Sequence, residues 1–250
     1  MREAIAAISL LLCGCATTPA ETAPFEIDAP ESDPARPTLE AEIATARGTV
    51  ETFFGSPFPQ PLRVVLAPDR ARFNAALPEQ WGMRETECWM VGVGAADFLA
   101  ILSPTAWARE ACEHDGGDRA HLRGIITHEL THAYHGQNNP TRDFTGMDDM
   151  GWFVEGLAVL VADQLETREG ASAADAIAAG AAPNALSEAW SGRYRYGVCG
   201  SLVQYIDRTY GRETVIALLA ATSNQDAMDR LGVSEQEFLA GWRIWMQRGA

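Results

Sequence analysis

The sequence has no long hydrophobic run and few basic residues. No stretch reaches the roughly 18–20 consecutive apolar residues of a membrane-spanning helix, so we expect no membrane span. The chain has 19 Lys+Arg against 34 Asp+Glu, a formal net charge of −15, and its basic residues form no cluster. Because an acidic surface repels phosphate backbones, this balance argues against nucleic-acid binding. The 47% of hydrophobic residues are enough to bury a core, which argues against disorder.

Residues 1–14 have the pattern of a lipoprotein signal peptide. A short charged start, Met1–Arg2, is followed by the apolar run Ala4–Leu12, which is too short to span a bilayer. The run ends in Leu-Cys-Gly-Cys, which resembles the lipobox of bacterial lipoproteins. The resemblance implies that an acylated Cys15 begins the mature protein and anchors it in a lipid bilayer of the cell envelope. The alternatives are an ordinary cleaved signal peptide and an N-terminal helix with two incidental cysteines.

Residues 15–37 are predicted to form a disordered tether. Five of the 13 prolines lie in this segment, among Ala, Thr, Glu and Asp. A segment of this composition has almost nothing to bury and stays extended in water. Ala16, directly after the acylated cysteine, favours an outer-membrane anchor that faces the periplasm. The folded domain is therefore expected to span residues 38–250.

Three cysteines remain in the predicted domain, at Cys88, Cys112 and Cys199. In an oxidising compartment an odd number leaves at least one thiol unpaired. We favour a Cys88–Cys112 disulfide with Cys199 buried and free, and the spacing leaves the other pairings open.

Hydrophobic periodicity and turn residues predict an α+β fold, with a small N-terminal sheet packed on a mainly helical lobe. Strands are expected at residues 62–67, 88–93 and 98–102, the last two forming a hairpin, and helices at residues 39–54 and 69–77. After Asp118 the pattern is that of helices and loops, with a capping box at Ser234–Glu237 before the last helix. The chain contains no internal repeat, and its length fits one large or two small domains.

The most specific motif is His128-Glu129-x-x-His132, an H-E-x-x-H sequence in a helix that Asp118 can begin and Gly136 can end. At about 100° per residue the two histidines lie about 40° apart around the helix and one turn apart along it. Both imidazoles can therefore reach one ion, with Glu129 beside it. In a chain with 5 His, the motif arises by chance on the order of 0.01 times per chain.

Glu155 is the predicted third metal ligand. It is the only acid of the otherwise apolar helix Trp152–Ala162, where a carboxylate is costly unless it is paired with a cation. No Lys or Arg lies in this helix before Arg168, so an ion held by His128 and His132 is the simplest partner. A solvent-exposed helix end or a remote arginine is the alternative.

The H-E-x-x-H motif and the downstream W-x-x-E-G-x-A sequence around Glu155 resemble the gluzincin clan of zinc metallopeptidases, in particular its peptidase MA-like members. The resemblance covers roughly residues 39–247 and implies a zincin-like fold. It also implies that one Zn2+ ion is bound by His128, His132 and Glu155, and that Glu129 is the general base.

A tyrosine usually supplies an oxyanion donor in related enzymes; Tyr196 matches its placement best, and Tyr194 is the reserve. The implied function is hydrolysis of a peptide or protein substrate through a metal-activated water, with Glu129 moving the proton. The strand Phe98–Leu102 is the candidate edge for an extended peptide. A non-catalytic binding or assembly lipoprotein that retains the zincin fold is the alternative function.

Several residues depart from related patterns or have no assigned partner. Asn138 occupies the position of the last histidine in the metzincin motif, so the metzincin interpretation fails. His135 and His121 are predicted either to lie on the surface or to contact the metal ligands without binding the ion themselves. Asp163 is one candidate for the carboxylate that orients a ligating histidine.

Overall fold

The computed structural model describes residues 24–166 and 168–249. The predicted signal peptide, the predicted acylation site Cys15 and the first part of the predicted tether lie outside these residues. Within them the chain forms a four-stranded mixed sheet and eleven α-helices, which confirms the predicted α+β class. No helix in this part of the chain is both long and apolar enough to cross a membrane.

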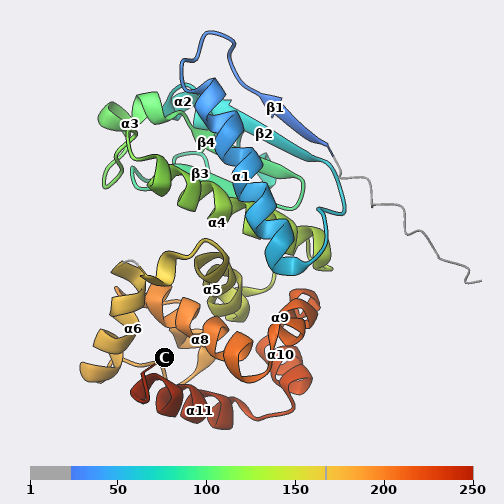
Figure 1. Cartoon of the computed structure of the whole chain (residues 1–250), viewed down its shortest axis with the longest axis vertical. Helices are drawn as coiled ribbons and strands as arrows, with labels where there is room; N and C mark the ends of the chain where they lie inside the picture. Colours follow the sequence, from blue (N-terminus) through green and yellow to red (C-terminus); the bar gives the residue numbers. More distant parts are fainter. Residues whose placement is uncertain (1–23, 167, 250) are drawn as a thin grey trace, which may run out of the picture.

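The N-terminal lobe contains the sheet and the helices that cover it (Figure 1). Its elements are β1 (Phe25–Asp28), α1 (Arg36–Phe54), β2 (Leu62–Ala67), α2 (Arg70–Ala76), β3 (Gly92–Ala95), β4 (Phe98–Leu102), α3 (Pro104–Glu110) and α4 (Arg119–Asn138). Strand β2 has its predicted bounds. Helix α1 buries a stripe that includes Leu39, Ile43 and Val50, and it packs on α4. The sheet and α1 thus place α4 at the lower boundary of this lobe.

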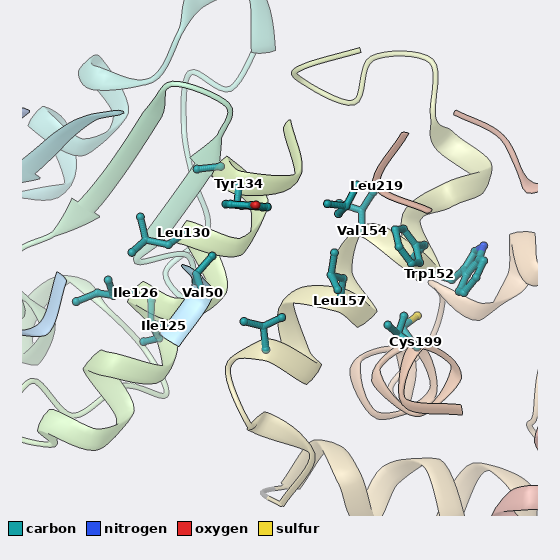
Figure 2. Packing of buried hydrophobic residues seen from close by; sticks show 14 of the residues in the cluster. Val50, Ile125, Ile126, Leu130, Tyr134, Trp152, Val154, Leu157, Cys199 and Leu219 are labelled. Carbon is teal, nitrogen blue, oxygen red and sulfur yellow. The ribbon is translucent and has the colours of Figure 1, made fainter. Parts of the chain in front are cut away.

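The C-terminal lobe is helical throughout the described residues. Its elements are α5 (Gly151–Val161), the short 3-10 helix η3 (Gln164–Glu166), α6 (Arg168–Ala178), α7 (Leu186–Ala189), α8 (Arg195–Thr209), α9 (Arg212–Ala217), α10 (Asn224–Leu231) and α11 (Glu235–Gln247). The capping box that begins α11 is present, as predicted. Helix α5 packs most extensively on α8, and Figure 2 shows Leu157 and Cys199 in that contact.

The strand order is β1-β2-β4-β3, with β1, β2 and β4 parallel and β3 antiparallel to β4. The prediction that Phe98–Leu102 is an edge strand is therefore wrong. All five residues of β4 are apolar and buried, as expected for a strand with neighbours on both sides. The edge beside α4 is β3, the first strand of the predicted hairpin.

The predicted tether is wrong at its C-terminal end. Phe25–Asp28 forms β1, which pairs with β2, and the Phe25 ring packs edge-on against Phe58 with ring centroids 5.1 Å apart. Helix α1 begins at Arg36 and not at residue 39. Proline is tolerated in the first turn of a helix, and two alternating apolar residues in a short segment are enough for an edge strand. The domain therefore includes residues that composition assigned to the tether.

Helix α4 begins where the sequence predicts and ends later. The Asp118 carboxylate accepts hydrogen bonds from the backbone N–H groups of Ala120 and His121, both at 3.0 Å. The helix continues past Gly136 to Asn138. Gly136 has another role, because a Cβ there would lie 2.7 Å from the backbone nitrogen of Ala96. Its missing side chain lets α4 approach the β3–β4 turn.

The favoured cysteine arrangement is confirmed. A disulfide joins Cys88 to Cys112, and Cys199 is free and buried. The disulfide links the loop before β3 to the loop before α4. It therefore holds together two segments that, as described below, line one cleft.

Candidate metal centre

The structure brings together the three predicted metal ligands. His128 and His132 lie one turn apart on α4, and Glu155 lies on α5. A Glu155 carboxylate oxygen is 3.4 Å from Nε2 of His128 and 3.7 Å from Nε2 of His132. One ligand atom from each residue lies within 4.8 Å of the other two. The three side chains could therefore hold a metal ion.

The triad is sheltered but not sealed. The side chains of His128 and His132 are 11% and 9% exposed, and that of Glu155 is 24% exposed. Glu155 is thus neither remote from the imidazoles nor at a free helix end. A three-ligand set that remains partly accessible has room for a further ligand from solvent or substrate, as open metal sites require.

Charges within the triad hold a proton in the metal-free protein. Burial acts to lower the pKa of His128, but its hydrogen bond to Glu155 and the charges of Glu129 and Glu155 outweigh it and raise that pKa to about 9. Burial acts to raise the pKa of Glu155, but the two histidines keep it below its usual value. Burial lowers the pKa of His132 to about 4. A proton therefore occupies the position between His128 and Glu155 that a cation would take.

Gln164 on η3 orients the first histidine. Its side-chain oxygen lies 2.9 Å from Nδ1 of His128, so the Nδ1–H group donates to it and Nε2 is left to face Glu155. The proposed orienting role of Asp163 is wrong, because Asp163 is exposed at a left-handed position, φ +55°, on the turn before η3. An amide oxygen provides the fixed tautomer that a carboxylate usually provides. The sequence carries no signal for this contact, which joins residues 36 positions apart.

Glu129 lies between the triad and the edge strand β3. Its carboxyl group accepts a hydrogen bond from the backbone N–H of Gly94, and burial raises its pKa to about 7. A Cβ on Gly94 would lie 2.2 Å from the backbone oxygen of Glu129, and one on Gly92 would lie 2.8 Å from Cγ of Glu129. The two glycines of β3 therefore permit the helix and the strand to touch. Glu129 is placed near the triad and has a pKa suited to proton transfer near neutral pH.

The two candidate tyrosines lie in different environments. Tyr196 lines the cleft together with His128 and Glu129, and its ring centroid is 6.5 Å from that of His128. Burial raises the pKa of its hydroxyl. Tyr194 does not line the cleft, and its ring instead packs against the guanidinium of Arg193, 4.4 Å from the ring centre. The structure therefore places Tyr196, and not Tyr194, beside the triad.

His135 and His121 have separate surroundings. His135 is fully buried, with ring centroids 4.8 Å from Phe144 and 5.5 Å from Phe153. Of its two predicted positions, the one on the surface is therefore wrong, and the one near the ligands is left. Burial lowers its pKa to about 3. His121 is exposed, and its Nε2 lies 2.8 Å from Nδ1 of His114. Neither histidine joins the triad.

A cleft with two arms opens onto the triad, and both arms are lined by His128, Glu129 and Tyr196. The larger arm, about 420 Å³, has a polar end lined by Glu113, His114, His121, Gln164 and Arg195. The smaller arm, about 220 Å³, has an apolar wall lined by Met83, Val93, Phe144, Val154 and Trp190. Of the lining, the sequence singled out His121, His128, Glu129, His132, Glu155 and Tyr196. The other lining residues belong to no motif, and they come from loops, from β3 and from the helices around the cleft.

Arg70 and the disulfide hold the rim of the larger arm. The Arg70 guanidinium donates to the carbonyl oxygens of Cys88 at 3.2 Å and Glu110 at 2.8 Å, and to Thr86 Oγ1 at 3.0 Å. Next to Cys88, the Trp89 side chain is 41% exposed at the cleft. The rim is therefore fixed by covalent and charged contacts and not by a regular element.

The site is thus a cluster of three side chains that could hold a metal ion, with an adjacent carboxyl group. The sequence matches no protein-family model and no curated protein sequence.

Proposed function

We propose that this chain is a zinc-dependent metallopeptidase of the gluzincin type, anchored in the cell envelope by an acylated Cys15. The observation that carries the proposal is the convergence of His128, His132 and Glu155, whose ligand atoms lie within 4.8 Å of one another, beside the buried carboxyl group of Glu129. A binding protein has no need of that fourth residue.

Zinc is the ion that this donor set favours. Two imidazoles and one carboxylate are typical of catalytic zinc sites, whereas structural zinc sites use four protein ligands. Mg²⁺ and Ca²⁺ prefer oxygen ligands throughout. When bound, zinc acidifies water and polarises a carbonyl group.

Glu129 is the proposed proton carrier. Because its pKa is raised to about 7, both its ionised and its protonated forms are populated near neutral pH. The ionised form takes a proton from the attacking water, and the protonated form delivers it to the leaving amine. The Gly94 N–H group holds the carboxyl group in place for both steps.

Strand β3 and Tyr196 are the proposed substrate contacts. The cleft is lined by Gly92, Val93 and Gly94 of this edge strand, so an extended peptide can pair with β3 by strand addition. This takes over the role that the sequence assigned to Phe98–Leu102. The Tyr196 hydroxyl stays protonated because burial raises its pKa, and it can donate a hydrogen bond to the developing oxyanion.

The decisive variant is Glu129→Gln. We expect it to abolish hydrolysis of a peptide library while the zinc content, measured by elemental analysis, stays near one ion per chain. A chelator should abolish hydrolysis by the unaltered chain, and added zinc should restore it. Full activity of Glu129→Gln would remove Glu129 as the base.

The binding or assembly alternative has a different signature. An unaltered chain that takes up one zinc ion but leaves every library peptide intact would support it against the peptidase. The anchor is tested separately, because Cys15→Ser should release the protein from membranes. Continued membrane association of that variant would contradict acylation at Cys15.

A further inference from the structure

Arg195 lines the larger arm of the cleft and forms no ion pair with the described acidic residues. The ion pairs of the described residues engage nine arginines, and Arg195 is not among them. It is the first residue of α8 and lines the larger arm with Glu129 and Tyr196. Its charge helps to lower the pKa of Glu155 but forms no ion pair with it. In a chain of net charge −15, an arginine that faces a cleft and forms no ion pair points to an anionic ligand.

Two aromatic rings hold the side chain of Arg195. Its guanidinium carbon lies 5.2 Å from the ring centre of Trp190 and 5.1 Å from that of Tyr196. These distances are within the range of cation–π contacts. The Arg195 side chain also donates a hydrogen bond to the Tyr196 hydroxyl, and the other N–H donors of its fork remain suited to a carboxylate.

Arg195 is the only Lys or Arg among the described residues that line either arm of the cleft. Of the other groups that line the larger arm, Glu113 is exposed and His114 has a pKa lowered by burial. Arg195 is therefore the fixed positive charge available to a bound substrate.

We propose that Arg195 binds a carboxylate of the peptide substrate, so that the cleft selects peptides with an anionic group next to the cleaved bond. The carboxylate belongs either to the chain terminus or to an acidic side chain, and both present the same planar acceptor. This inference rests on the proposed peptidase function and adds the chemical class of its substrate.

Three small peptides test the proposal. The probes are acetylated pentaalanine with a free C-terminal carboxylate, the same peptide as a C-terminal amide, and that amide with glutamate as its central residue. Binding is measured by tryptophan fluorescence, to which Trp190 beside Arg195 contributes. The protein is the zinc-loaded full chain in detergent with Glu129→Gln, which prevents turnover during the titration.

We expect at least one carboxylate peptide to bind about tenfold more tightly than the neutral amide, the ratio that a charge-assisted hydrogen bond supplies. Preference for the free acid identifies the chain terminus, and preference for the glutamate peptide identifies a side chain. In Arg195→Gln the ratio should fall to about one. Arg195→Met, which keeps an unbranched side chain between the two rings, should behave in the same way.

Arg193→Gln is the matched control. Arg193 lies two residues before Arg195 and carries the same charge, but its side chain does not line the cleft. It should keep the preference, and a melting curve of each variant checks folding. Equal binding of the three peptides by the chain with Arg195 would overturn the proposal. So would a preference that survives Arg195→Gln or Arg195→Met.

The same measurements separate this inference from the proposed function. Carboxylate-selective binding by Arg195, with no hydrolysis by the chain that retains Glu129, would leave the anion site and remove the peptidase. Hydrolysis of the library with no carboxylate preference would leave the peptidase and remove the anion site.

Discussion

Helices α4 and α5 contribute to one site in different ways. Helix α4 supplies His128, Glu129 and His132 within a single turn and a half, so the geometry of one helix sets their relative positions. Helix α5 supplies Glu155, whose distance from the imidazoles depends on how two lobes pack. Figure 1 shows the two helices facing each other where the lobes meet. Local geometry thus prepares half of the site, and tertiary contact completes it.

The packing beneath each helix differs accordingly. Helix α4 packs on β3, where the absence of a side chain at Gly94 leaves room for the backbone of Glu129. Helix α5 packs on α8, where a Cβ on Gly156 would lie 2.3 Å from the Cys199 carbonyl oxygen. Figure 2 shows Ile126 and Leu130 on α4, away from Leu157 of α5. Each helix is therefore positioned by its own lobe, and the geometry of the site depends on the packing within both lobes.

The largest expected effect follows from removing the α5 contribution. The zinc affinity of Glu155→Ala should fall by more than the roughly 10–100-fold that is lost when a residue that orients a ligand is removed. The reason is that this substitution removes a ligand itself and leaves only a buried pair of imidazoles. Elemental analysis and a zinc titration measure the loss. A variant that remains fully loaded at stoichiometric zinc would show that α4 suffices and that Glu155 is not a ligand.

Gln164→Ala tests the contact that orients an α4 ligand from the other lobe. Without the 2.9 Å contact to Nδ1, His128 can rotate or change tautomer, and zinc affinity should fall about 10–100-fold. Asp163→Ala is the matched control one residue away, and its zinc affinity should equal that of the unaltered chain. A larger loss of zinc affinity in Asp163→Ala than in Gln164→Ala would instead identify Asp163 as the residue that orients His128.

Two glycine substitutions separate the two packing contacts. Gly94→Ala should cost about 1–3 kcal/mol of stability through overpacking and reduce hydrolysis, because it pushes β3 away from Glu129, while the triad still binds zinc. Gly156→Ala should cost a similar amount and weaken zinc binding, because it moves α5.

Thermal melts and zinc titrations of both variants make the comparison. Gly48→Ala is the control, since a Cβ at Gly48 has no neighbour within 4 Å, and it should be neutral or stabilising. Identical zinc affinity in the two variants would contradict the assignment of α4 and α5 to separate supports.

A change of pH, with no substitution, distinguishes the two histidines. In the metal-free protein the pKa of His128 is raised to about 9 and that of His132 is lowered to about 4. Zinc needs both rings neutral, so binding near pH 7 should displace about one proton, from His128. Zinc affinity should then fall about tenfold for each pH unit from pH 8 to pH 6.

Calorimetry in two buffers with different ionisation enthalpies counts the displaced proton. His128→Ala should bind zinc weakly and remove this proton release. A zinc affinity of the unaltered chain that is independent of pH over this range would contradict a protonated His128 paired with Glu155.

Much of the site could be predicted from short patterns. The H-E-x-x-H spacing, the lone acid of an apolar helix and the N-cap at Asp118 each depend on a few neighbouring residues, and the structure brings His128, His132 and Glu155 together. The observed disulfide, between Cys88 and Cys112, is also the pairing that the sequence analysis favoured. The zincin-like fold and the peptidase function remain predictions.

The wrong predictions share a physical cause, which is that they concern partners distant in sequence. Composition assigned Phe25–Asp28 to a tether because a strand of four residues becomes stable only when β2 pairs with it. The hairpin was recognised, but only the pairing of β4 with β2 decides that β3 is the edge. In the same way, Gly136 resembles a helix end until the backbone of Ala96 is seen to lie against it.

The amino-acid sequence by itself determined the elements and the donors on α4, because helix periodicity, capping and ligand spacing act over a few residues. Tertiary structure alone decided that Gln164 reaches His128, that β3 faces the cleft and that Arg195 and Tyr196 line it. These contacts arise when two lobes bury their apolar faces together, and the side chains that they bring into the cleft have no common pattern along the chain.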